Sequence, residues 1–96
     1  MTEQELIDND RRDFTDFDDQ VERASKELSS LLTVLHRYNV KDRTENIYGL
    51  KHTLESMSGK YICAAAALKA AKTAGLYSYP VFNPNSPQSA FGVVLT

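Results

Sequence analysis

Apolar side chains recur along the first half of the chain at alternating spacings of three and four residues. The series consists of Phe14, Phe17, Val21, Ala24, Leu28, Leu31, Leu35 and Tyr38. A seven-residue repeat that continues over more than three heptads is typical of a helix with one narrow packing face. It predicts a long helix over residues 13–38.

A second series has the same spacing and predicts a second helix over residues 44–74. It consists of Ile47, Leu50, Leu54, Met57, Tyr61, Ala64, Leu68 and Ala71. Thr44, or Asp42 together with Glu45, would cap the start of this helix, and Gly75 would end it.

The polar link between the two series is short, so the helices are expected to pack antiparallel as a hairpin. Residues whose numbers sum to 85 then face each other, for example Leu35 and Leu50, or Ala24 and Tyr61. Large side chains meet small ones along this seam, as close packing requires. The predicted fold class is therefore all-α. Gly59 lies inside the second helix at an outward position and leaves open a bend there.

Two further segments flank the hairpin and complete a single small domain. Residues 1–12 are acidic and are expected to form a short helix, with Thr2 and Glu5 as its capping pair. Residues 75–96 hold three prolines, several aromatic residues and no charged side chain, and they predict an extended arm. The end of the arm, residues 91–95, has the composition of a strand that pairs with an edge on another chain.

The composition excludes several classes of protein. With 42% apolar and 25% charged residues, the chain does not fit a disordered segment, a collagen-like repeat or a disulfide scaffold. Its longest apolar run, Tyr61–Leu68, is far shorter than the roughly 20 residues of a membrane span, and its start lacks the pattern of a signal peptide. Since Cys63 is its single cysteine, we expect a cytoplasmic protein that binds no membrane.

Catalytic and metal-binding motifs are absent from the sequence. There is no Gly-rich phosphate loop, no CxxC and no HExxH motif, and both histidines, His36 and His52, lie at outward positions. We therefore expect no catalytic residue, no cofactor and no metal site, and a protein that is not an enzyme.

The net charge of −2 conceals an uneven distribution, with −6 over residues 1–30 and +4 over residues 31–96. Acids near the start of the first long helix are the expected binding surface for a larger protein, which would make this chain a small regulator, adaptor or inhibitor. A simpler interpretation is a solvated face whose charges suit a helix N-terminus. The acids are Asp13, Asp16, Asp18 and Asp19.

The second helix is expected to need a cover, because nearly every residue from Tyr61 to Ala71 is apolar. The arm, the short N-terminal helix or a second copy would supply it, and a second copy would complete a helical bundle. The preferred interpretation is a homo-oligomer. Its expected interface consists of Ala66, Ala67, Ala70, Tyr77, Tyr79, Phe82 and Phe91.

Two alternative functions stay open at this point. Basic residues near the loop end of the hairpin, with tyrosines among them, are compatible with contacts to nucleic acid. These residues are Arg37, Lys41, Arg43 and Lys51. A structural subunit would instead use the uncharged arm to bind neighbouring subunits.

Overall fold

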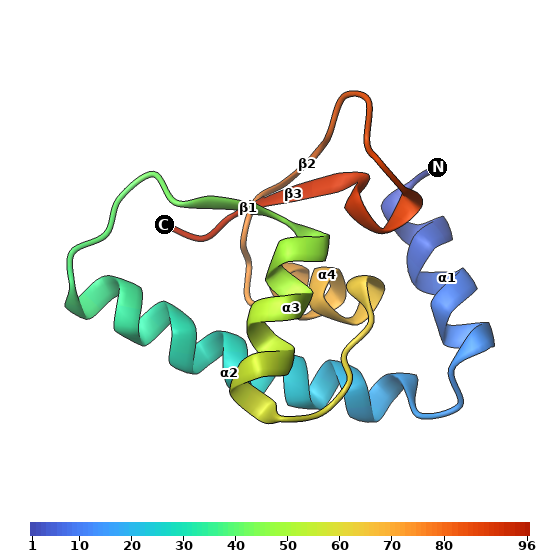
Figure 1. Cartoon of the computed structure of the whole chain (residues 1–96), viewed down its shortest axis with the longest axis horizontal. Helices are drawn as coiled ribbons and strands as arrows, with labels where there is room; N and C mark the ends of the chain where they lie inside the picture. Colours follow the sequence, from blue (N-terminus) through green and yellow to red (C-terminus); the bar gives the residue numbers. More distant parts are fainter.

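The chain forms four α-helices and a three-stranded antiparallel sheet, so the predicted all-α fold is wrong. The computed structural model describes all 96 residues, and its architecture is a small α/β fold (Figure 1). The elements in chain order are α1 (Glu3–Asp13), α2 (Phe17–Arg37), β1 (Thr44–Asn46), α3 (Ile47–Ser58), α4 (Ala64–Thr73), β2 (Ser78–Pro80), the 3₁₀ turn η1 (Pro87–Ser89) and β3 (Phe91–Val94).

Helix α1 confirms the predicted short acidic helix. The hydroxyl of Thr2 accepts a hydrogen bond of 3.1 Å from the N–H of Glu5, and the Glu5 carboxylate accepts one of 3.2 Å from the N–H of Thr2. This reciprocal pair satisfies donors that the start of a helix leaves open. Leu6 and Ile7 are buried and hold α1 against α4.

Helix α2 confirms the first long helix, although it begins at Phe17 instead of residue 13. It ends as the pattern predicts. Asn39 adopts a positive φ of 57°, and its N–H donates a hydrogen bond of 3.0 Å to the carbonyl of His36. A left-handed residue at this position closes a helix, and asparagine tolerates the conformation better than most residues.

The predicted second helix is two helices, and this is the main correction to the hairpin. Helix α3 ends at Ser58 because Gly59 adopts a φ of +72°, a left-handed conformation that suits glycine and stops an α-helix. The chain then changes direction before α4 begins. The antiparallel seam therefore does not continue along its full length, and two of its expected members, Met57 and Tyr61, are 39% and 51% exposed.

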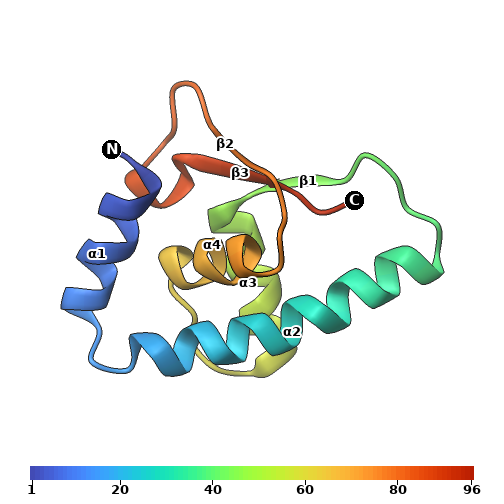
Figure 2. The ribbon, with the colours of Figure 1, turned by 180° about the vertical axis from the view of Figure 1, so that it is seen from behind.

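The break in the helix lets α4 occupy the centre of the molecule. Helix α2 runs along one side of it, α1 and α3 flank it, and the sheet lies on the opposite side from α2 (Figures 1 and 2). Seven of its ten residues are buried, and most of them are alanines whose small side chains let neighbouring helices approach closely. The chain's own elements thus cover the alanine-rich face.

The C-terminal arm folds back on its own chain. β3 is the central strand of the sheet and pairs antiparallel with β1 on one side and with β2 on the other. The predicted strand at residues 91–95 is therefore confirmed as β3. Its partners, however, are strands of the same chain and not an edge on another chain.

Candidate functional site

A cavity of about 330 Å³ lies where five parts of the chain meet. They are α1 with Phe14 directly after it, α3, α4, the turn η1 and the linker of residues 59–63. The lining residues are Asp10, Phe14, Tyr48, Lys51, Tyr61, Cys63, Ala64 and Gln88. No other hollow in the molecule combines acidic, basic, aromatic and thiol side chains.

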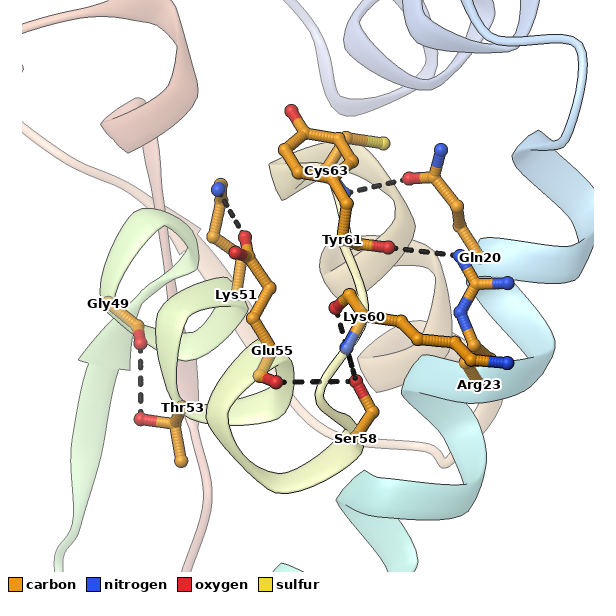
Figure 3. A network of polar contacts seen from close by, with 10 residues as sticks. All are labelled: Gln20, Arg23, Gly49, Lys51, Thr53, Glu55, Ser58, Lys60, Tyr61 and Cys63. Atoms are coloured by element: carbon orange, nitrogen blue, oxygen red, sulfur yellow. Dashed lines mark hydrogen bonds and ion pairs between the residues drawn. The ribbon is translucent and has the colours of Figure 1, made fainter.

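Two side chains of α2 hold the linker in place beside this cavity (Figure 3). The Gln20 carboxamide oxygen accepts a hydrogen bond of 2.8 Å from the N–H of Cys63, and the Arg23 guanidinium donates one of 3.0 Å to the carbonyl of Tyr61. At the other end of the linker, the Ser58 hydroxyl accepts a hydrogen bond of 3.1 Å from the N–H of Lys60. These contacts fix the backbone on both sides of Tyr61.

Lys51 is a buried cation with its partners supplied by the chain itself. Its ammonium group pairs with the carboxylate of Glu55, one helical turn further along α3 (Figure 3). The same group lies 4.9 Å from the ring centre of Tyr61 and 5.7 Å from that of Tyr48. A cation between two aromatic faces and beside a carboxylate is electrostatically satisfied in spite of its burial.

Asp10 is the acidic group of the cavity wall, and its polar neighbour there is the Cys63 thiol. Its carboxylate takes part in none of the ion pairs of the structure. Because the Lys51 ammonium is paired with Glu55, Asp10 is the carboxylate of the cavity wall that has no cation of its own. The rings of Phe14 and Tyr61, whose centres are 5.7 Å apart, form the aromatic wall beside it.

The thiol in the cavity is held in its protonated form. Burial raises the pKa of Cys63 to about 12, and the nearby Asp10 carboxylate acts in the same direction. Burial also raises the pKa of Tyr61. Since a cysteine reacts as its thiolate, Cys63 is a poor nucleophile at neutral pH.

The acids that the sequence singled out lie around the corner between α1 and α2, and most are paired with arginines of the same region. Asp18 lies 3.6 Å from Arg11, and Asp13 lies 3.4 Å from Arg12. Asp16 lies 3.8 Å from Arg23 and accepts a hydrogen bond of 2.9 Å from Gln20. Asp19 is exposed and makes no ion pair.

The seven side chains expected at an oligomer interface are divided by the fold. Ala66, Ala67, Ala70 and Phe91 are buried within the chain. The Tyr79 ring lies over the backbone of Gly92 on the neighbouring strand. Only Tyr77 and Phe82, which are 69% and 93% exposed, point to solvent and are available to a second copy.

The four basic residues expected to contact nucleic acid do not form one surface. Lys51 is buried in the cavity wall, and Arg43 lies 3.6 Å from the carboxylate of Glu45. Arg37 and Lys41 are exposed at the end of α2 and in the loop that follows it. The structure thus separates Lys51 from the other three residues.

His36 and His52 are both exposed, and the His52 ring stacks edge-on against Tyr48 with ring centres 4.5 Å apart. No three histidine, cysteine or acidic side chains lie together as a metal ion would require. None of the helices has the length and apolar character needed to cross a membrane.

Sequence reasoning missed the cavity because its walls come from distant segments. The spacing of Tyr48, Lys51 and Glu55 places them on one helix face, and this could have been recognised. Nothing in the sequence relates Asp10 or Gln88 to that face. Comparisons with protein-family models, with curated proteins and with solved structures find no match to this chain.

Proposed function

We propose that this protein is a non-catalytic binding module that docks on a basic segment of a larger protein. The observation that carries the proposal is the cavity, in which the unpaired carboxylate of Asp10 lies beside the aromatic wall of Phe14 and Tyr61. A lysine or arginine side chain of the partner would meet a negative charge and the negative faces of two rings. An arginine fits best, because its planar guanidinium stacks on aromatic faces and binds carboxylates with two hydrogen bonds.

The state of the other groups supports binding over catalysis. The Cys63 thiol is protonated at neutral pH, and the Lys51 ammonium is engaged by Glu55 and two tyrosines. Neither group has a histidine beside it in the cavity wall to act as a base. The cavity therefore offers recognition and lacks an activated nucleophile.

The acidic corner between α1 and α2 supports the same kind of partner. Asp10 and Phe14 of the cavity and the exposed Asp19 belong to one continuous stretch of chain around this corner. A basic partner segment that inserts one side chain beside Asp10 would keep its neighbouring charges near these acids. The arginine-paired acids contribute less, because exposed ion pairs are already partly neutralised.

The experiment is a binding titration monitored by fluorescence anisotropy. The probe is a labelled ten-residue peptide of alternating arginine and glycine, with a peptide of alternating glutamate and glycine as control. We expect binding of the basic peptide alone, weakened by salt, and lost in the Asp10→Asn variant. Equal binding by the wild-type protein and by Asp10→Asn would show that the cavity does not recognise the basic side chain.

A further inference from the structure

The three-stranded sheet has one face against the helices and one face open. Along residues 91–95, the side chains of Phe91, Val93 and Leu95 are buried. Since alternate residues of a strand point to opposite faces, Gly92 and Val94 belong to the other face. Figures 1 and 2 show α3 and α4 beneath the sheet and no helix above it. The outer face of the sheet is therefore accessible to another molecule.

Two tyrosines of the C-terminal arm lie on this open face. The antiparallel register places Tyr79 opposite Gly92. Tyr77 lies opposite Val94, whose N–H donates a hydrogen bond of 2.9 Å to the Tyr77 carbonyl. Because Gly92 has no side chain, the Tyr79 ring lies against the strand on one side and leaves its other side to solvent.

The two rings together form a broad aromatic surface. Their planes are inclined by only 21° and their centres are 6.3 Å apart, close to the roughly 6.6 Å between alternate residues of a strand. The rings therefore lie side by side along the strand. Successive bases of a helical strand are only about 3.4 Å apart, so this spacing suits two bases of a stretched single strand, one on each ring.

A basic side chain adjoins one end of the tyrosine pair. Thr44 of β1 lies opposite Val94, in the same row of the sheet as Tyr77. Arg43 continues the pairing one residue further, since its carbonyl accepts a hydrogen bond of 2.8 Å from the N–H of Leu95. The loop that leads into β1 thus begins beside the Tyr77 end of the open face.

The charges of this loop complement a phosphate backbone. The Arg43 side chain is 50% exposed, and Lys41 is exposed and makes no ion pair. Both are placed to contact phosphates of a strand that leaves the sheet at this end. Asp42 and Glu45 offset part of the charge, so base stacking has to supply most of the affinity.

We propose that the open face of the sheet binds single-stranded nucleic acid, with successive bases stacked on Tyr77 and Tyr79 and phosphates beside Lys41 and Arg43. Binding tolerates changes of sequence, because every base has a face that stacks on an aromatic ring. The proposal does not rest on the docking of a basic segment, since the cavity of Asp10 belongs to other elements.

The test is fluorescence anisotropy of the full chain with a labelled ten-residue oligothymidylate at low salt. We expect binding, and clearly weaker binding of an oligomer of the same length made of abasic nucleotides. Tyr77→Ala removes one stacking surface and should weaken binding about fivefold or more, whereas Tyr77→Phe retains the ring and should bind as the wild type does. Replacing both Lys41 and Arg43 with glutamine should weaken binding and flatten its salt dependence.

Tyr38→Ala is the matched control, because Tyr38 is exposed to a similar extent as Tyr77 but lies at the end of α2, outside the sheet. This variant and Asp10→Asn should bind the oligonucleotide as the wild type does. Circular dichroism melts establish that each variant is folded. Absence of binding by the wild type overturns the proposal, as do equal binding of the abasic oligomer and unchanged binding by Tyr77→Ala. Competition by cellopentaose, a neutral oligosaccharide, would assign the face to sugars and also overturns it.

Discussion

Gln20 and Cys63 are 43 residues apart in the sequence and are joined by a buried hydrogen bond of 2.8 Å. The side chain of Gln20 is 1% exposed, and its carboxamide oxygen accepts from the N–H of Cys63 at the start of α4. The N–H groups in the first turn of a helix have no partner within the helix. Gln20 therefore satisfies a donor of the linker and fixes where α4 begins relative to α2.

Replacing Gln20 with leucine should destabilise the fold by about 1–3 kcal/mol, because it leaves the N–H of Cys63 buried without an acceptor. Urea unfolding measures this change in the free energy of unfolding. Gln4→Leu is the control, since the Gln4 side chain is exposed, and it should change stability by less than about 0.5 kcal/mol. Equal effects of the two substitutions would contradict the structural role of Gln20.

The sheet contains a second contact that a substitution can test. A Cβ atom added to Gly92 would overlap the ring of Tyr79, which crosses the backbone of β3. Gly92→Ala should therefore cost about 1–3 kcal/mol of stability through overpacking. Combining it with Tyr79→Ala should cost less than the sum of the two single changes, because removal of the ring removes the overlap.

Gly59→Ala is the control for the comparison of Gly92→Ala with and without Tyr79→Ala. An added Cβ at Gly59 meets open space, so only its positive φ of 72° matters, and the expected cost is about 1 kcal/mol. Tyr79→Ala should not change that cost. Strict additivity of Gly92→Ala with Tyr79→Ala would argue against the contact.

The Lys51–Glu55 pair should respond unequally to the loss of its two members. The Glu55 side chain is 24% exposed and can be hydrated alone, whereas the Lys51 side chain is only 9% exposed. Glu55→Gln should therefore cost about 1–3 kcal/mol by leaving a buried ammonium without its counter-charge. Lys51→Met should cost less, and it should reduce the effect of Glu55→Gln in the double variant. Chemical unfolding of the four proteins gives the coupling, and a neutral Glu55→Gln would show that the pair is not needed.

The pKa of Cys63 makes a prediction for alkaline pH. The thiol has an ordinary pKa of 9.0 and a pKa of about 12 in the fold, so between these values the unfolded chain loses a proton that the folded chain retains. Stability should therefore fall as pH rises above 9, with a slope approaching about 1.4 kcal/mol per pH unit. Cys63→Ala has no thiol to ionise, so its stability should fall less steeply over the same pH range. Parallel curves for the two proteins would contradict the assignment.

Capping residues and the apolar repeat correctly predicted those helix ends and helices that depend on interactions between residues close in the sequence. The capping pair of Thr2 and Glu5 predicted the start of α1, and the apolar repeat predicted α2 to within a few residues at its start. Gly75, which was predicted to end the second helix, has a φ of +81° and lies two residues past the end of α4. In each case a single residue type or one periodic pattern determines the outcome.

The apolar repeat gave a wrong prediction for residues 44–74, where tertiary packing and not local sequence determines the structure. The heptad series continues across Gly59, and spacing alone does not distinguish a bend from a complete change of direction. The alanines after Cys63 suit a free face or the centre of a small domain equally well, and the packing of α1, α2, α3 and the folded arm around α4 determines which one applies. The cavity could not be predicted, because Asp10, Lys51 and Gln88 meet only after that change of direction.

The most direct test of the cavity as a recognition site is an NMR titration of the ¹⁵N-labelled protein with Nα-acetylarginine amide. We expect amide shifts concentrated around Asp10, Phe14, Tyr48 and Tyr61, absent in Asp10→Asn and retained in Asp19→Asn, which removes an exposed and unpaired acid outside the cavity. Shifts spread over the exposed acids, or shifts that persist in Asp10→Asn, would contradict the account.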